Sequence, residues 1–326
     1  MRQGRKALIT GIAGQDGSYL AEHLLSMGYC VHGIIRRQSV AENQNSRVWH
    51  LGSKVTLHYG DLLDPFSLRR VMAAVLPDEI YNLASQSHVR ISFDVPAYTI
   101  QTNALGVFNI LETYREVCPS AHFYQASSSE MFGTSVDADG RQRETTPMHP
   151  TSPYGCAKVL GFNIVRHYRA AYGLFASNGI LFNHESRRRG SNFVTQKVVK
   201  SAVEILRGVC DVLELGNMDA QRDWGHSQDY VRAMHLILNH TEPDDFVVAT
   251  GETHSVREMV EYVFGKLGLN SDEHVRQDPR LIRPQELPYL CGDSTKAQEV
   301  LGWRPQYTFK TLLDDMIEGE RARQGA

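Results

Sequence analysis

The sequence predicts an α/β protein built on a doubly wound parallel sheet, with a smaller α/β lobe toward the C-terminal end. Three observations support this fold class. Short apolar runs alternate with helical patterns through the first half of the chain, a glycine-rich turn follows the first run, and the periodicity loosens after about Phe182. A chain of 326 residues is long enough for one large domain and a second lobe.

The first predicted element is the apolar run Lys6–Thr10, which ends at Gly11 and is typical of a buried parallel strand. A helical pattern follows and ends near Gly28. Strands alternating with helices favour a Rossmann-like sheet. The further strands are predicted at residues 29–35, 55–59, 79–83, 122–126 and 176–181, and the helices between them at 68–75, 102–117 and 154–172.

We place the domain boundary near residue 182. Residues 1–182 form the predicted Rossmann domain, and residues 183–326 form most of the smaller lobe. The lobe is predicted to contain helices at 193–206 and 256–267 and a strand at 246–249. Because the pattern is loose there, we expect the chain to cross between the two parts more than once.

The composition excludes several classes of protein. A formal net charge of −3 favours neither a nucleic-acid-binding nor a membrane-binding surface. No apolar run approaches the length of a membrane span, and the N-terminal residues lack the apolar segment of a signal peptide. The five cysteines show no CxxC pair or Cys/His spacing, which predicts free thiols and no metal site. We therefore expect a cytoplasmic protein.

The glycine-rich turn predicts a dinucleotide site. Glycines there permit a tight turn and let the backbone approach a pyrophosphate at the N-terminus of the following helix. The alternative is a turn between strand and helix that binds nothing. The residues of this turn that we expect to contact a cofactor are Gly11, Gly14, Gln15, Asp16 and Gly17.

The end of the second predicted strand indicates which dinucleotide binds. NAD sites usually place a carboxylate there for the ribose 2′-hydroxyl, but this chain has Arg36 and Arg37 and no acid until Glu42. Two guanidinium groups suit a 2′-phosphate, so the sequence favours NADP, the alternative being a pair of surface arginines.

Residues after the third and fourth strands extend this predicted site. We expect Asp61 and Leu62 to flank the adenine, and Leu83 and Ser85 to line the central part of the cofactor. The carboxyl ends of parallel strands form the ligand crevice of such sheets.

Tyr154 and Lys158 lie four residues apart in a predicted helix and share one face of it. A nearby ammonium lowers the pKa of a phenol, which lets the phenolate act as a base; a solvated helix face is the alternative. Ser128 and Glu130, at the end of the fifth predicted strand, would add a hydroxyl and a second acid/base, unless they form only a helix cap.

Over nearly its whole length the chain resembles the GDP-mannose 4,6-dehydratase family, extended short-chain dehydrogenases/reductases that act on nucleotide sugars. Two segments, Asn183–Ser186 and Arg222–Gly225, carry this resemblance more specifically than the glycine-rich turn. The other matching segments are residues 7–17, 81–84, 86–89, 125–130 and 152–158, and Arg283-Pro284 with Glu286.

The resemblance implies a closed redox cycle on one bound sugar. Tyr154, supported by Lys158 and Ser128, would take the proton from O4 of the sugar while C4 is oxidised by NADP. Glu130 would then remove the C5 proton and assist the loss of water from C6, where the hydride returns.

The resemblance also implies residues for binding and an oligomeric state. His184 and Arg189 would contact the cofactor, and the chain would form a homodimer or a homotetramer. The residues expected to contact the GDP-sugar are Ser87, Asn183, Glu185, Lys197, Arg222, Arg283 and Glu286.

Three positions depart from the family pattern. Ser128 replaces the usual threonine, Arg187 stands where a proline commonly follows Asn183–Ser186, and Leu287-Pro288 replaces Val-Asp. A roomier pocket could accept a GDP-manno-heptose, which is the alternative substrate. Two other functions are a 4-keto-sugar reductase, which does not require Glu130, and a non-catalytic nucleotide sensor, which does not require Tyr154 and Lys158.

Overall fold

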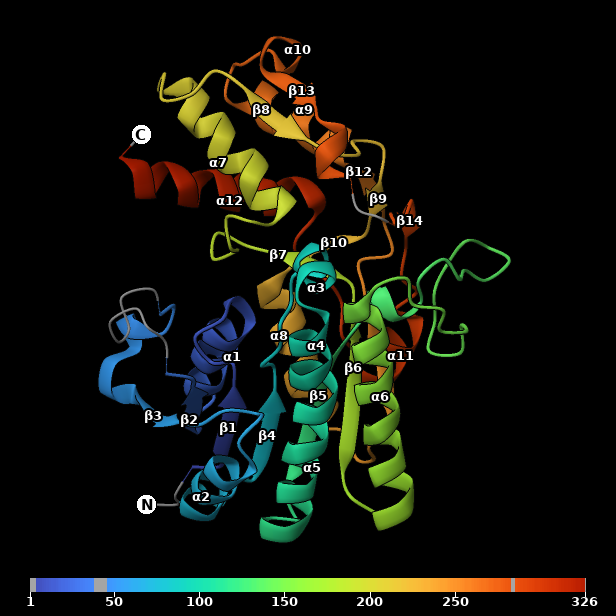
Figure 1. The fold of residues 1–326 in the computed structure, drawn as a ribbon. Coiled ribbons are helices and arrows are strands. Elements are labelled where there is room, and N and C mark those ends of the chain that lie inside the picture. The colour runs from blue at the N-terminus through green and yellow to red at the C-terminus, as the bar shows by residue number, and fades with distance from the viewer. Residues whose placement is uncertain (1–3, 38–45, 283–284, 326) are drawn as a thin grey trace.

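The computed structural model describes residues 4–37, 46–282 and 285–325. Its centre is a parallel seven-stranded sheet whose strand order reverses between β1 and β4, as in the predicted doubly wound fold (Figure 1). In spatial order the strands are β11 (Asp245–Val248), β6 (Ala176–Leu181), β5 (His122–Ser128), β4 (Glu79–Asn82), β1 (Lys6–Thr10), β2 (Cys30–Ile35) and β3 (Val55–Tyr59).

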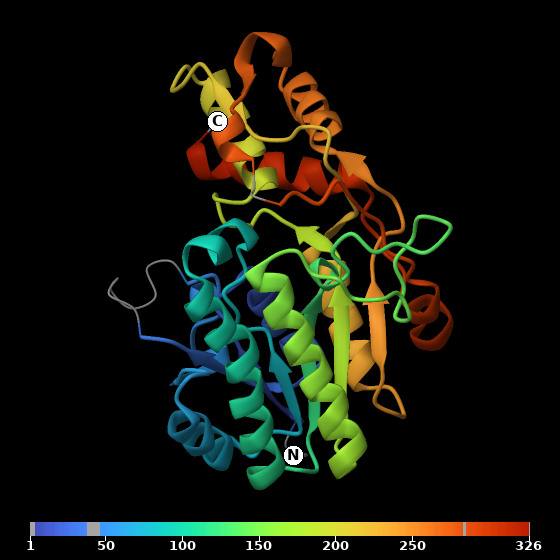
Figure 2. The same cartoon turned by 45° about the vertical axis from the view of Figure 1, so that its right-hand side comes forward.

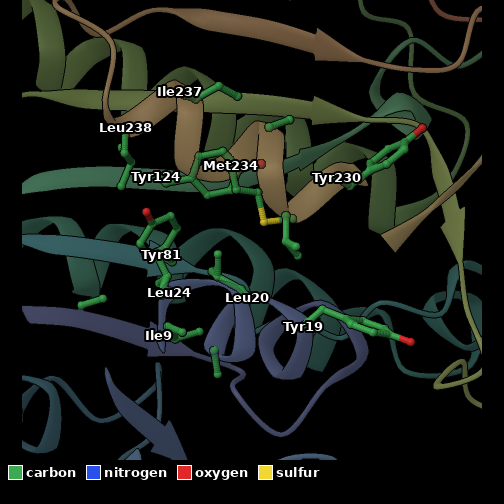
Figure 3. Close-up of a cluster of buried hydrophobic side chains, with 14 of the residues drawn as sticks. Ile9, Tyr19, Leu20, Leu24, Tyr81, Tyr124, Tyr230, Met234, Ile237 and Leu238 are labelled. Carbon is green, nitrogen blue, oxygen red and sulfur yellow. The ribbon is translucent and has the colours of Figure 1, made fainter. Parts of the chain in front are cut away.

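Helices cover both faces of this sheet (Figures 1 and 2). Because successive side chains of a strand point to opposite faces, the neighbours Leu8 and Ile9 belong to different buried clusters. Ile9 packs with Tyr81 and Tyr124, as Figure 3 shows. The helices on that face are α1 (Gln15–Ser26) and α8 (Ser227–Leu238), and those on the other are α2 (Pro65–Val75), α5 (Gly106–Val117) and α6 (Pro153–Tyr172).

The smaller lobe has a hydrophobic core of its own, which contains Trp224, Phe264 and Leu313. Its helices are α7 (Val194–Leu206), α9 (Val256–Lys266), α10 (Ser271–His274) and α12 (Phe309–Gln324). Its short strands are β8 (Leu213–Leu215), β9 (Gln221–Arg222), β12 (His254–Ser255), β13 (Val275–Gln277) and β14 (Tyr289–Leu290).

Shorter elements connect these parts. The strands β7 (Asn183–Glu185) and β10 (Trp224–His226) pair in parallel between the sheet and the lobe. The remaining helical segments are α3 (Val89–Asp94), α4 (Pro96–Ile100), the π-helical turn Gln101–Leu105, α11 (Thr295–Leu301), and 3₁₀ turns at Trp49–Lys54, Ser129–Met131 and Pro279–Leu281.

The predicted position of the strand at residues 246–249 in the smaller lobe is wrong. This segment forms β11, which pairs with β6 at the edge of the central sheet. The sequence of an apolar strand does not show which strand it pairs with, so the pattern alone could not assign β11 to the central sheet. We propose a division near residue 182 with α8, β11 and α11 assigned to the Rossmann part.

Asp229 holds the connection between α11 and α12 against α8. Its buried carboxylate accepts hydrogen bonds from the backbone N–H groups of Gln306 (2.9 Å) and Tyr307 (3.0 Å), and it forms an ion pair with Arg232. The indole N–H of Trp303 donates to the backbone carbonyl of Asp229 (2.8 Å). This carboxylate therefore stabilises the segment through which the chain returns from α11 to α12 of the smaller lobe.

We predict that Asp229→Asn lowers the free energy of unfolding by about 1–3 kcal/mol, because an amide has one oxygen: if it accepts from Gln306 and Tyr307, its NH₂ group faces the Arg232 guanidinium. Urea denaturation measures the change. The exposed Asp94, which pairs with Arg90, provides the control: Asp94→Asn should shift stability by less than about 0.5 kcal/mol. Equal effects of the two substitutions would contradict this role of Asp229.

Candidate active site

Two adjoining cavities lie at the carboxyl ends of the parallel strands. The first, of about 530 Å³, lies against the glycine-rich turn and the ends of β1 to β4. The second, of about 440 Å³, lies between the sheet and the smaller lobe. They are parts of one cleft, because five residues line both: Asp16, Leu83, Ser85, Ser87 and Arg189.

The glycine-rich turn brings its backbone close to the first cavity. Gly11 has φ +69°, and a Cβ atom there would lie 2.9 Å from the backbone nitrogen of Ala84. A Cβ atom on Gly17 would lie 2.4 Å from the carbonyl oxygen of Gly11. The glycines thus let the turn pack tightly on itself and against the segment after β4. The turn lines the first cavity at the N-terminus of α1, and the buried hydroxyl of Thr102, unpaired among the described residues, lines the same cavity.

The basic end of the first cavity contains Arg36 and Arg37, with Asp61 and Leu62 nearby in its wall. Arg36 donates a hydrogen bond to the hydroxyl of Tyr98 and lies over that ring, with 5.9 Å from its guanidinium carbon to the ring centroid. Guanidinium groups held in this way suit an anionic ligand. Tyr98 belongs to none of the motifs, so the sequence did not reveal it.

Arg47 is another lining residue that the sequence analysis missed. Its guanidinium donates to the backbone carbonyl of Arg188 (2.6 Å), and burial, together with the charges of Arg189, Arg323 and Arg188, lowers its pKa. Only the folded chain brings these arginines together. The cavity wall is therefore more basic than its motifs indicate.

The second cavity brings together the four predicted catalytic residues, Ser128, Glu130, Tyr154 and Lys158. Tyr154 and Lys158 lie in the first turns of α6, which begins after the N-cap Ser152. The Lys158 ammonium lies 5.6 Å from the centroid of the Tyr154 ring and donates to the backbone carbonyl of Ala126 (2.8 Å).

Ser128 also makes the helix-capping contact that we gave as the alternative to a catalytic role. Its hydroxyl accepts a hydrogen bond from the backbone N–H of Glu130 (3.3 Å). The same contact turns the chain so that both residues line the cavity. Ser128 therefore both caps this turn and lines the cavity.

Burial controls the ionisation of the tyrosine and the lysine. It raises the pKa of Tyr154 to about 12, although a hydrogen bond with Ser128 lowers it. Burial lowers the pKa of Lys158 to about 8. The sequence led us to expect a lowered tyrosine pKa; in this structure the phenol is buried and the ammonium donates to a backbone carbonyl instead.

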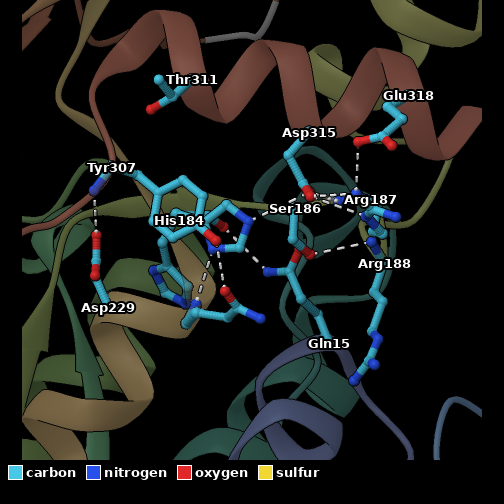
Figure 4. A network of polar contacts seen from close by, with 12 residues as sticks. Gln15, His184, Ser186, Arg187, Arg188, Asp229, Tyr307, Thr311, Asp315 and Glu318 are labelled. Carbon is cyan, nitrogen blue, oxygen red and sulfur yellow. Dashed lines mark hydrogen bonds and ion pairs between the residues drawn. The ribbon is translucent and has the colours of Figure 1, made fainter.

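Side-chain contacts join the glycine-rich turn to the segment 183–186 (Figure 4). Gln15 donates to the carbonyl of His184 (3.1 Å) and accepts from the hydroxyl of Ser186 (2.9 Å). The ring of His184 faces two acceptors, Asp16 (2.7 Å) and the carbonyl of Phe182 (2.7 Å). Although burial lowers it, these partners raise the pKa of His184 overall, which favours an imidazolium paired with Asp16.

The predicted sugar contact Glu185 is buried, and its carboxylate has protein partners. It accepts from the hydroxyl of Thr195 (2.6 Å) and forms an ion pair with Arg189 (2.9 Å). Arg189 in turn lies over the ring of Phe193, with 3.5 Å between the guanidinium carbon and the ring centroid. Glu185 therefore fixes Arg189 at the junction of the two cavities.

The remaining predicted substrate contacts line the second cavity. Arg222 and Glu286 form an ion pair of 3.3 Å, and Lys197 donates to the backbone carbonyl of Glu214. The predicted residues in this wall are Ser87, Asn183, Lys197, Arg222 and Glu286, whereas Arg283 lies outside the described residues. The sequence did not indicate the apolar lining residues Phe193, Leu215, Val256 and Leu281.

Two features are absent from the described ranges. In residues 4–37, 46–282 and 285–325, no helix is long and apolar enough to cross a membrane. The same residues contain no group of three or more His, Cys, Asp or Glu side chains placed to hold a metal ion.

Solved structures with the same fold bind nicotinamide cofactors. DesIV from Streptomyces venezuelae, a dTDP-glucose 4,6-dehydratase solved with NAD, superposes with a TM-score of 0.87 at 24% identity and covers 98% of each chain. RMD from Pseudomonas aeruginosa, complexed with NADPH, gives a TM-score of 0.80 at 24% identity and covers 98% of this chain and 100% of its own.

Sequence comparison identifies the family. The chain is 49% identical to GDP-mannose 4,6 dehydratase 2 of Arabidopsis thaliana, over 96% of this chain and 86% of the relative. It is 47% identical to the GDP-mannose 4,6 dehydratase of Homo sapiens, over 96% and 91%. The family model described as GDP-mannose 4,6 dehydratase matches residues 8–316. The chain therefore belongs to the GDP-mannose 4,6-dehydratase family.

Proposed function

We propose that this chain converts GDP-mannose to GDP-4-keto-6-deoxymannose by 4,6-dehydration, with NADP as its cofactor. One observation carries the proposal beyond family membership: Tyr154, Lys158 and Glu130 line a single cavity that adjoins the dinucleotide cavity. A reductase does not require the carboxylate, and a sensor does not require the tyrosine and lysine. The relatives are named for GDP-mannose, which favours this substrate over a heptose.

The first cavity fits a nicotinamide dinucleotide. The backbone of Gly11, Gly14 and Gly17 would hold the pyrophosphate, and Arg36 and Arg37 would hold a 2′-phosphate. When bound, the nicotinamide supplies the acceptor for the hydride from C4 of the sugar and its donor to C6. The paired arginines at the end of β2 are the reason to propose NADP rather than NAD.

The residues of the second cavity supply the proton transfers. Tyr154 takes the proton from O4, Ser128 donates a hydrogen bond to the same oxygen, and the Lys158 ammonium stabilises the phenolate. A ketone at C4 acidifies the C5–H bond, so Glu130 can remove this proton. The acid form of Glu130 then protonates the leaving C6 hydroxyl, which departs as water and leaves a C5–C6 double bond. Return of the hydride to C6 would give an enolate, and a proton from solvent, delivered to C5 through Glu130, would complete the product.

The substrate contacts divide by charge. We propose that Lys197 and Arg222 bind the diphosphate and that Glu286 binds the ribose hydroxyls. The side-chain oxygen of Asn183 is buried, lines this cavity and has no hydrogen-bond partner among the described residues, so it can accept from the sugar. Arg283 remains a predicted diphosphate contact.

We propose a cytoplasmic homodimer or homotetramer. Leu105, Phe108 and Leu160 are exposed on the neighbouring elements around α5 and α6, and an apolar surface of this kind favours contact with a second copy. The cysteines are free thiols, which suits a reducing compartment.

The direct test is incubation of the NADP-loaded protein with GDP-mannose and, separately, with a GDP-manno-heptose. We expect a 4-keto-6-deoxy product from GDP-mannose without added reductant, detected by mass spectrometry as the loss of one water. A folded, loaded protein that converts neither sugar would overturn the dehydratase proposal, and conversion of the heptose alone would change its substrate.

We predict that Glu130→Gln lowers formation of this product by at least about a thousandfold, since an amide cannot exchange the C5 proton. Slow oxidation at C4 should remain, and solvent deuterium should no longer enter C5. Nuclear magnetic resonance in D₂O measures both. The exposed Glu258 offers a matched control, because Glu258→Gln should keep full activity. Full dehydration by Glu130→Gln would remove Glu130 from the mechanism.

We predict that the double substitution Arg36→Ala/Arg37→Ala weakens NADP binding by about a hundredfold and changes NAD binding by less than about threefold. The reason is that NADP alone carries the 2′-phosphate. Calorimetric titration measures both affinities. Arg70→Ala removes an exposed arginine on α2 and should change neither. Equal losses for the two cofactors would argue against a 2′-phosphate site.

We predict that Lys158→Met abolishes activity yet stabilises the cofactor-free protein by about 3 kcal/mol near pH 7. Folding lowers the pKa of Lys158 from 10.5 to about 8, so its charge opposes folding fully below pH 8. This penalty disappears as the pH rises from about 8 to 10.5, and the advantage of the variant should shrink accordingly. Urea denaturation at several pH values tests this, with Lys200→Met, at a partly exposed lysine of α7, as the control.

A further inference from the structure

Asp223 is a fully buried carboxylate that lies between β9 and β10. One of its oxygens accepts from the backbone N–H (2.8 Å) and the hydroxyl (2.7 Å) of Thr250. The other accepts from the backbone N–H groups of Gly251 (2.8 Å) and Gly292 (3.3 Å). Four donors therefore converge on one side chain, which lines neither cavity.

These partners lie where the chain passes between the sheet and the smaller lobe. Thr250 and Gly251 follow β11 of the central sheet and lead to β12 of the lobe. Gly292 follows β14 of the lobe and leads to α11, which packs against β11. Asp223 itself follows β9 of the lobe and precedes β10, so its carboxylate joins three crossings of the chain.

Additional contacts hold the same crossings. Arg141 donates to the backbone carbonyls of Gly251 (3.2 Å) and Gly292 (3.5 Å). The backbone N–H of Asp223 donates to the carbonyl of Leu290 (3.1 Å). Asp223 thus accepts from the N–H groups of Gly251 and Gly292, whereas Arg141 donates to their carbonyls.

The residues on either side of Asp223 do line the second cavity. Arg222 lies there in its ion pair with Glu286, and Trp224 pairs in the register of β10 with Asn183 of β7. A shift of Asp223 would therefore move the side chains proposed to hold the diphosphate and the sugar. The glycine-rich turn and the residues of α6 make none of the hydrogen bonds of Asp223, and a shift reaches the turn only through the contact of the segment 183–186 with Gln15 and Asp16.

We propose that Asp223 is a positioning residue for the nucleotide-sugar: by joining the three crossings, it places Arg222, Trp224 and Asn183 in the second cavity. The inference rests on the proposed function, in which this cavity binds GDP-mannose. Asparagine has the same size, but its NH₂ group would face backbone N–H groups that need an acceptor.

The test compares Asp223→Asn with Asp219→Asn, which changes an exposed carboxylate two residues before β9. We expect Asp223→Asn to raise the KM for GDP-mannose and the Kd for GDP by about tenfold or more, because the buried groups that face the new NH₂ group lose their acceptor. The kcat should fall by less than about threefold, and the Kd for NADP should stay within about twofold. Asp219→Asn should change none of these.

A milder variant keeps the inference testable if Asp223→Asn does not fold. Thr250→Val removes one of the four hydrogen bonds and should raise the Kd for GDP by about threefold, with NADP affinity unchanged. If every folded variant among Asp223→Asn and Thr250→Val has the same Kd for GDP as Asp219→Asn, the proposed role of Asp223 is overturned. Loss of kcat with an unchanged KM would overturn it as well. Failure of the native chain to convert GDP-mannose would instead contradict the proposed function, because GDP binding is measured without turnover.

Discussion

The contact between the glycine-rich turn and the segment 183–186 is the constraint on which the rest of this site depends. Gln15 and Asp16, which begin α1, bind the backbone and side chains of His184 and Ser186. The first pair belongs to the dinucleotide cavity, and the second leads into the smaller lobe. This contact holds the segment that leads into the second cavity beside the turn that lines the first, which is the arrangement that the proposed hydride transfer between cofactor and sugar requires.

The ionisation of the predicted catalytic residues Tyr154 and Lys158 follows from the same contact between the two parts of the chain. The two parts of the chain together bury the phenol of Tyr154 and the ammonium of Lys158. Burial raises the pKa of the phenol and lowers the pKa of the ammonium, so both groups favour their neutral forms. In the proposed reaction, the bound cofactor and sugar would therefore supply part of the environment that favours a phenolate beside a charged lysine. This is why the pKa of Tyr154 is raised in the chain alone, whereas a tyrosine beside a lysine is expected to have a lowered pKa.

Much of the central sheet could be predicted, because its strands are short apolar runs separated by long helical patterns. The glycine-rich turn, Arg36 and Tyr154 could be placed in the site because each occupies a fixed position relative to a strand or helix. The sequence could not assign β11 to the sheet edge, since edge pairing depends on residues far away along the chain. It also could not reveal Tyr98, Arg47 or the partners of Glu185, which come together only in the folded structure.

The return of α8 and β11 to the central sheet affects how this protein can be divided. The apolar side of α1 packs with Tyr81 and Tyr124 and is covered by α8. In the chain, α8 comes only after α7, β8 and β9 of the smaller lobe. A fragment ending near residue 182 would expose this surface to water and would lack the edge strand. The two parts therefore cannot fold one after the other along the chain: the Rossmann part is completed only after the ribosome has passed α11, which ends at Leu301.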